Sequence, residues 1–169
     1  MSQAKNKLKW CLKKAEEEMK EQGRHKGLIK IKPNIEKAKE HILKSEHYFN
    51  ATEYLKTGDY SDISASTIFY CMYHCLLAIA AKIGYESGNQ ECTFALIYTL
   101  IEDNKIEFDK ETLDKISALD ASKNTEQTTI RIREKYQYGT NLSLDDNTYN
   151  ELIELAKKVM SKTKVIIER

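Results

Sequence analysis

Residues that break a helix are scarce in this sequence. Its 169 residues include one proline and six glycines, so few positions force a turn, and long helices are favoured over a β architecture. The opening residues Met1 to Lys5 lack the apolar stretch of a secretory signal. There is no Gly-rich phosphate loop, telling pair of catalytic carboxylates or Ser/His/Asp arrangement. The sequence therefore carries none of the common enzyme signatures.

The composition is typical of a folded globular protein. Charged residues make up 31% and hydrophobic residues 41%, which excludes both a disordered chain and a typical membrane protein. A chain of this length can bury a hydrophobic core without cross-links. We therefore expect an all-α fold.

One stretch, Ser64 to Gly84, organises the rest of the chain. Between Ile68 and Ala81 only His74 has a strongly polar side chain, so a helix here has no wide solvent face. This run of about fourteen residues is shorter than the roughly 20 that span a bilayer. We therefore predict the central helix of a soluble bundle and no membrane association.

The remaining apolar periodicity predicts an up-and-down bundle of five to six helices, preceded by an amphipathic helix over residues 3–22. The central helix begins near Ser61, with Ser61 or Asp62 as N-cap. A polar stretch at 120–129 is expected to interrupt the fifth helix. The chain divides into residues 1–32, a basic N-terminal helix and connection, and residues 33–169, the bundle domain. The expected bundle helices cover about 34–57, a central helix that starts within 59–61 and reaches Gly84, then about 89–103, 110–139 with that interruption, and 144–167.

The net charge of +1 hides an asymmetry along the chain. Residues 1–32 contain ten Lys or Arg against four Glu, so this segment is strongly basic and the rest is acidic. A basic arm can contact nucleic acid or an acidic partner. The interspersed glutamates favour a different interpretation, a solvated helix lying against the acidic body.

The four cysteines, Cys11, Cys71, Cys75 and Cys92, lie in helical segments without an export signal. This pattern predicts reduced thiols and a cytoplasmic protein. Cys71, His74 and Cys75 could supply three ligands of a soft metal site, but a fourth is missing, and buried cysteines usually act as small hydrophobic residues. We therefore predict neither a metal site nor a cofactor.

Histidines elsewhere in the chain give no metal motif. His41 and His47 are six residues apart on one predicted helix, so they lie on different faces and do not share a metal ion. Both are predicted to be surface residues. For His74, the ordinary expectation is a core histidine hydrogen-bonded to a neighbouring helix; the alternative is a residue that lines a ligand groove.

Three segments carry a family resemblance. A helix ends in Lys56-Thr-Gly-Asp-Tyr60, and the central helix contains Phe69-Tyr-Cys-Met-Tyr-His-Cys75. Further on stands Arg133-Glu-Lys-Tyr-Gln-Tyr-Gly139. Over roughly residues 34–165, this order resembles HEPN domains, namely the small prokaryotic proteins with a Tyr-Tyr-Ala-Met-Phe-His-Ala-like central helix and an Arg-x-x-x-Asp-Tyr-Gly segment.

The resemblance implies a helical bundle that is commonly a homodimer and that occurs alone or beside a minimal nucleotidyltransferase. Some members of the family are toxins that cut RNA without a metal ion, using an Arg-x(4–6)-His motif. In such a motif the arginine would hold the phosphate with two donors and the histidine would transfer a proton. Here Arg133 is followed five residues later by Tyr138 instead, and a phenol, with an ordinary pKa of about 10, is a poor base near neutral pH.

The segment from Arg131 to Tyr138 is the best candidate for ligand contacts. Arg131, Arg133 and Lys135 stand among Tyr136 and Tyr138, a combination suited to phosphate binding beside base stacking. The competing interpretation is a helix end whose tyrosines pack on the bundle while its arginines pair with Glu126, Glu134 or a partner chain. Together with His74, the candidate ligand-binding residues are Arg131, Arg133, Tyr136 and Tyr138.

Three functions follow as expectations. The preferred one is a binding or interaction protein, a dimer that binds nucleotide or RNA and pairs with a nucleotidyltransferase in a toxin-antitoxin-like system. The alternative is a metal-independent endoribonuclease with a non-standard site of Arg133 and Tyr138; the missing motif argues against an enzyme. The third is a helical assembly protein without a ligand.

Overall fold

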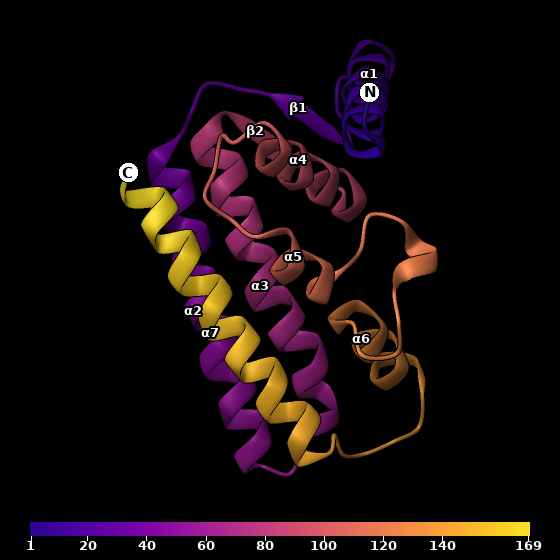
Figure 1. Ribbon diagram of the computed structural model, residues 1–169, viewed down its shortest axis with the longest axis vertical. Coiled ribbons are helices and arrows are strands. Elements are labelled where there is room, and N and C mark those ends of the chain that lie inside the picture. Colours follow the sequence, from indigo (N-terminus) through magenta and orange to yellow (C-terminus); the bar gives the residue numbers. More distant parts are fainter.

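The computed structural model is helical, as the composition predicts, and it describes residues 1–169, the side chain of Ala121 excepted (Figure 1). A long amphipathic helix comes first and six further α-helices follow it. The elements in chain order are α1 (Gln3–Gln22), β1 (Leu28–Lys30), α2 (Ile35–Thr57), α3 (Ser61–Ile83), β2 (Tyr85–Ser87), α4 (Gln90–Glu102), α5 (Lys110–Ile116), the 3-10 helix η1 (Ala121–Lys123), α6 (Thr129–Tyr138) and α7 (Asp146–Glu168).

Helix α3 is the central element of the fold. It packs against α2, α4, α6 and α7, and α2, α3 and α7 lie side by side along the long axis (Figure 1). Fourteen of its 23 residues are buried, among them Phe69, Met72 and Leu76. The prediction of a buried central helix is confirmed.

By length and apolar composition alone α3 could cross a bilayer, because the helix is longer than the apolar run that marked it in the sequence. Within its most apolar window, 67% of the residues are buried inside the protein. That burial is the pattern of a core helix.

Helix ends follow local capping chemistry in most cases. The side chain of Asp145 accepts a hydrogen bond from the Thr148 backbone N–H and caps α7. The predicted cap of α3 is wrong: Tyr60 occupies the N-cap position. The hydroxyl of Ser61 instead accepts a hydrogen bond of 2.9 Å from the backbone N–H of Leu144, which ties the start of α3 to the loop before α7.

The predicted interruption of the fifth helix is confirmed. α5 ends at Ile116 and α6 begins at Thr129, with only the short η1 between them. Side chains organise this connection: Asn124 Oδ1 accepts a hydrogen bond of 2.7 Å from the Ala118 backbone N–H, and the Thr129 hydroxyl donates to the carbonyl of Lys115 at 3.1 Å. Polar residues that favour such local bonds over a helical ladder explain the break.

A small sheet was not expected from the sequence. Leu28–Lys30 pairs antiparallel with Tyr85–Ser87. The pairing depends on Gly84, which ends α3 with φ 95° and whose backbone carbonyl accepts a hydrogen bond from Ile31. Strands of three residues have no readable alternation, so their pairing follows from the tertiary structure.

Helix α1 lies against α4, at the opposite side of the molecule from α7 (Figure 1). Lys5 forms an ion pair with Asp103 at 2.5 Å, and Lys7 forms one with Glu91 at 2.7 Å. These pairs match the interpretation of a basic helix lying against an acidic body. Helix α1 packs on α4 and β1 pairs with β2, so residues 1–32 contact the bundle. The division of the chain at residue 32 into two parts stays a prediction.

Candidate functional site

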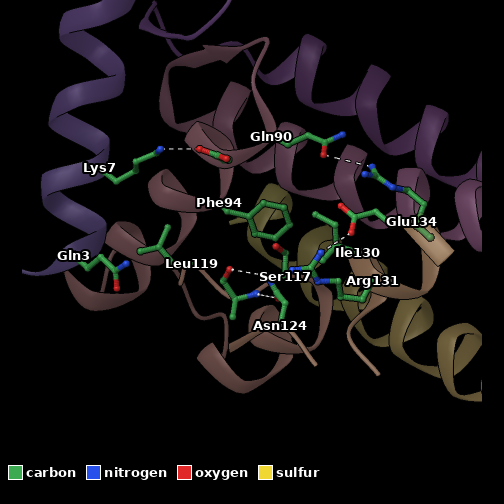
Figure 2. A pocket seen from close by; sticks show the side chains of 13 residues that line it. Gln3, Lys7, Gln90, Phe94, Ser117, Leu119, Asn124, Ile130, Arg131 and Glu134 are labelled. Carbon is green, nitrogen blue, oxygen red and sulfur yellow. Dashed lines mark hydrogen bonds and ion pairs between the residues drawn. The ribbon is translucent and has the colours of Figure 1, made fainter. Parts of the chain in front are cut away.

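A cleft lies between α1, α4, the segment 117–124 and the start of α6, and has a volume of about 540 Å³. Figure 2 shows Lys7, Gln90, Phe94 and Arg131 around it. Its size is within the ordinary range for small-molecule sites, roughly 300–1,000 Å³. Two of the residues predicted from the sequence, Arg131 and Arg133, line this cleft.

Arg133 is the most unusual side chain of the cleft. Its guanidinium carbon lies 4.3 Å from the centroid of the Phe69 ring, a cation–π contact with the central helix. One terminal nitrogen donates a hydrogen bond of 3.4 Å, at the long end of the range, to Gln90 Oε1. Its Nε is buried and, among the described groups, has no hydrogen-bond partner. Because an arginine can donate five hydrogen bonds, much of its donor capacity is unused.

The other cations of the cleft are paired. Arg131 forms an ion pair of 2.9 Å with Glu134, and Lys7 forms its pair with Glu91 across α1 and α4 (Figure 2). The pairing of Arg131 with Glu134 is the one foreseen in the competing interpretation of this segment. Among the described ion pairs Arg133 takes part in none, while Arg131 and Arg169 do. The cleft therefore holds two neutralised pairs and one uncompensated guanidinium.

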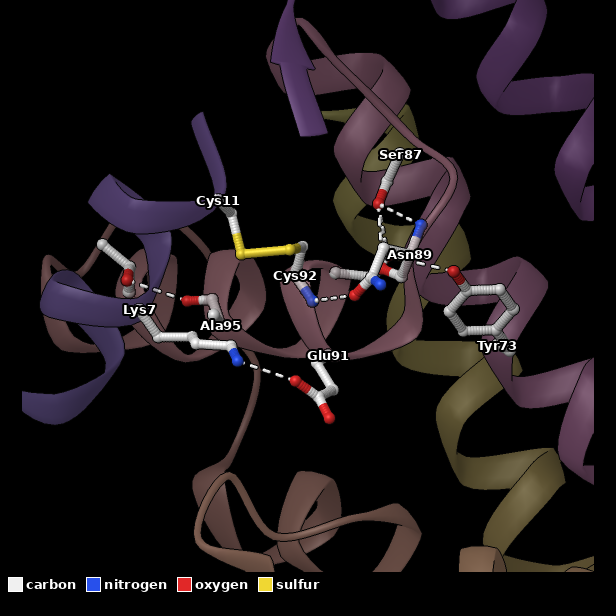
Figure 3. The surroundings of a disulfide bond; sticks show 10 residues. Lys7, Cys11, Tyr73, Ser87, Asn89, Glu91, Cys92 and Ala95 are labelled. Carbon is white, nitrogen blue, oxygen red and sulfur yellow. Dashed lines mark hydrogen bonds and ion pairs between the residues drawn. A yellow bond between two sulfur atoms is a disulfide. The ribbon is translucent and has the colours of Figure 1, made fainter. Parts of the chain in front are cut away.

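A disulfide joins two walls of the cleft. Cys11 of α1 and Cys92 of α4 are bonded across a sequence separation of 81 residues, next to the pair of Lys7 and Glu91 (Figure 3). The prediction that these two thiols are reduced is wrong, because packing of α1 on α4 brings together residues that lie far apart in the sequence. The cytoplasmic location stays a prediction, without support from these two cysteines.

The two predicted tyrosines lie outside the cleft. Tyr138, at the end of α6, is 78% exposed. Tyr136 is half-buried against the core, with the Lys135 ammonium 5.6 Å from its ring centroid. Neither lines the cleft in which Arg133 sits.

His74 lies at another site on α3. Its Nδ1 is 3.0 Å from Nδ1 of His41 on α2, and its ring stacks on Tyr48 with centroids 5.5 Å apart. The expectation of a histidine bonded to a neighbouring helix is confirmed. The prediction that His41 is a surface residue is wrong, because this contact half-buries it; His47 is exposed as predicted.

The structure thus separates the predicted ligand-binding residues. Phe69, which contacts Arg133, and His74 are five residues apart on α3, so they point about 140° away from each other around the helix axis. His74 faces α2, whereas Arg133 lies on the side of α4 and α6. A single groove lined by both residues, as the sequence suggested, does not form.

Cys71 and Cys75 are free thiols buried against α2. Both sulfurs lie within hydrogen-bond distance of the Ser45 hydroxyl, at 3.3 and 3.1 Å. Burial raises the pKa of Cys71 to about 12 and that of Cys75 to about 11. Both are therefore protonated, unreactive core residues at neutral pH.

Sequence reasoning missed the residues that complete the cleft. Lys7, Gln90 and Phe94 belong to α1 and α4, and none stands in a recognisable motif. Only packing of α1 on α4 brings them to Arg133. Comparison with protein-family models finds none that matches this chain, and comparison with curated proteins finds no matching sequence.

Proposed function

We propose that this chain is a HEPN-like binding protein whose cleft between α1, α4 and α6 holds the phosphate groups of a nucleotide. The supporting observation is Arg133, a guanidinium fixed on the Phe69 ring with a buried, unpartnered Nε and no ion pair among the described residues. A half-buried cation without a counter-charge is costly, and a phosphate oxygen would remove that cost.

Other groups of the cleft suit the same ligand. Gln90 presents a side-chain amide to the cleft, and Phe94 adds an apolar surface. The ion pairs of Arg131 with Glu134 and of Lys7 with Glu91 could open to give further donors, because both pairs lie at exposed positions where such pairs contribute little stability. The volume of about 540 Å³ suits a single nucleotide better than a folded RNA.

The same proposal includes membership of the HEPN family, a homodimer and a nucleotidyltransferase partner. These three parts rest on the resemblance of residues 34–165 to HEPN domains. They concern the chain's assembly, and phosphate binding in the cleft does not depend on them. An adjacent gene for a minimal nucleotidyltransferase would support the paired system.

Endoribonuclease activity is the second candidate, since Arg133 could hold a scissile phosphate. The geometry weighs against it, because Tyr138 lies outside the cleft and His74 lies on another side of α3. Incubation of purified protein with RNA in the presence of chelator tests this candidate. Cleavage that disappears in Arg133→Gln would favour the enzyme over the binding protein.

The binding proposal is tested by thermal unfolding with ATP. A ligand that binds only the folded state raises Tm as its concentration rises. We expect this rise in the wild type and in Arg24→Gln, a control at an exposed arginine, and its loss in Arg133→Gln. An unchanged Tm of the wild type at millimolar ATP would leave the ligand-free assembly protein as the better description.

A further inference from the structure

The two half-buried histidines between α2 and α3 form a pair with unusual geometry. Nδ1 of His41 and Nδ1 of His74 are 3.0 Å apart, and the two rings are tilted by 35° with centroids 5.2 Å apart. Nitrogen atoms of the same type thus face each other from two helices. The pair lies on the side of α3 that faces α2, whereas Arg133 of the cleft lies on the side of α4 and α6.

Without an added ion, the pair can make one hydrogen bond. One neutral ring donates from Nδ1–H, and the other accepts with the lone pair of its Nδ1. Burial lowers the pKa of both imidazoles, that of His74 to about 4, so both rings are neutral at pH 7. Neutral imidazole is the form that binds metal ions.

We propose that His41 and His74 form a two-imidazole site for a borderline divalent transition-metal ion such as Zn²⁺ or Ni²⁺. Two nitrogens bound to one such ion at about 2.0–2.1 Å lie about 2.9 Å apart at a right angle and about 3.3 Å apart at a tetrahedral angle. The observed 3.0 Å falls within that interval. Two helices packed through their cores hold this spacing in the absence of the ion.

Binding needs a change of tautomer and no net proton release. The ring that donates from Nδ1 must carry its proton on Nε2, so that both Nδ1 lone pairs turn toward the ion. Among the described residues no group of three His, Cys, Asp or Glu side chains gathers around a common point, so water fills the remaining positions. Such a site is open and exchangeable.

The neighbours of the pair set its affinity. Tyr48 stacks on His74 and holds its ring, while the Lys44 ammonium lies over the Tyr48 ring at 5.1 Å. Lys44 also lowers the pKa of His74, after burial and His41, so its positive charge acts on the site. Lys44→Gln should therefore tighten metal binding.

The test uses the full chain without a histidine tag, dialysed against chelator and titrated with Zn²⁺. We expect a rise in Tm with the logarithm of metal concentration, its loss in His41→Gln and His74→Gln, and its retention in His47→Gln, an exposed histidine on the same helix. Mg²⁺, which prefers oxygen ligands, should give no shift.

A second measurement needs no variant. Ni²⁺ should broaden the imidazole proton resonances of His41 and His74 before that of His47. Either an absent Tm rise in the wild type, an equal rise in all three variants, or broadening of His47 first would overturn the site.

Discussion

The guanidinium of Arg133 lies 4.3 Å from the centroid of the Phe69 ring, so a residue of α6 near the molecular surface rests on a fully buried residue of the central helix. Phe69 also stacks with Tyr73 one turn further along α3. The position of the cation in the cleft therefore depends on the core. A substitution in the core should therefore change the affinity for the proposed ligand.

Phe69→Leu removes the ring and keeps an apolar side chain at the same place. We expect a loss of about 1–2 kcal/mol in the free energy of unfolding, the usual cost of a misfitting core residue. Nucleotide affinity should fall several-fold, because Arg133 loses the surface that positions it. Val159→Ala, in α7 and outside the cleft, is a control that should lower stability and leave affinity unchanged.

Reduction of the disulfide between Cys11 and Cys92 should lower stability strongly. Closing a loop of 81 residues corresponds to about 4.5 kcal/mol in the chain-entropy description. Urea unfolding with and without reductant measures the difference, and a variant with serine at both positions should not respond to reductant. Because α1 supplies Lys7 to the cleft, reduction should also weaken nucleotide binding. Equal unfolding midpoints in both conditions would show that the bond contributes nothing.

In metal-free protein, His74 should make stability depend on pH between about 6.5 and 4. Burial holds the pKa of His74 near 4, below the ordinary value of 6.5, so the unfolded chain gains a proton in this range that the folded protein does not. Stability therefore falls as pH falls through this window. Urea midpoints at several pH values should show a flatter dependence in His74→Gln and an unchanged one in His47→Gln. A profile of His74→Gln identical to that of the wild type would contradict this assignment.

Two glycines with positive φ allow a matched comparison. At Gly84, with φ 95°, an added Cβ would lie 2.8 Å from the carbonyl oxygen of Ile31, whereas at Gly23, with φ 67°, it would meet nothing within 4 Å. Gly23→Ala should cost about 1 kcal/mol from backbone strain alone. Gly84→Ala should cost clearly more, about 2–3 kcal/mol, because the strand connection must also shift. Equal losses of stability in the two variants, measured by thermal unfolding, would mean that the contact of the added Cβ with the Ile31 carbonyl costs nothing.

The sequence predicts the helical framework well, because the near-continuous apolar run of α3, the apolar periodicity of α7 and the polar break near Asn124 are local signals. Pairings between distant residues are not local. Cys11 with Cys92, His41 with His74, and Leu28–Lys30 with Tyr85–Ser87 each arise only when helices pack.

The candidate site shows the same limit. Arg131 and Arg133 stand out in the sequence as cations among aromatic residues, and both line the cleft. The sequence does not show that His74 lies apart from these arginines. Which face of α3 contacts α2 and which contacts α4 and α6 is known only from the packing of the helices. Lys7 and Gln90 carried no signal, since their significance comes from their proximity to Arg133.

Isothermal titration of wild type and Arg133→Gln with ATP at low and high salt measures whether Arg133 binds the phosphate groups. We expect measurable binding to the wild type that weakens at high salt. Arg133→Gln should bind at least tenfold more weakly, because it loses a charge-assisted hydrogen bond to phosphate. Binding of equal strength to both proteins would contradict the assignment of Arg133 as the phosphate-binding residue of this cleft.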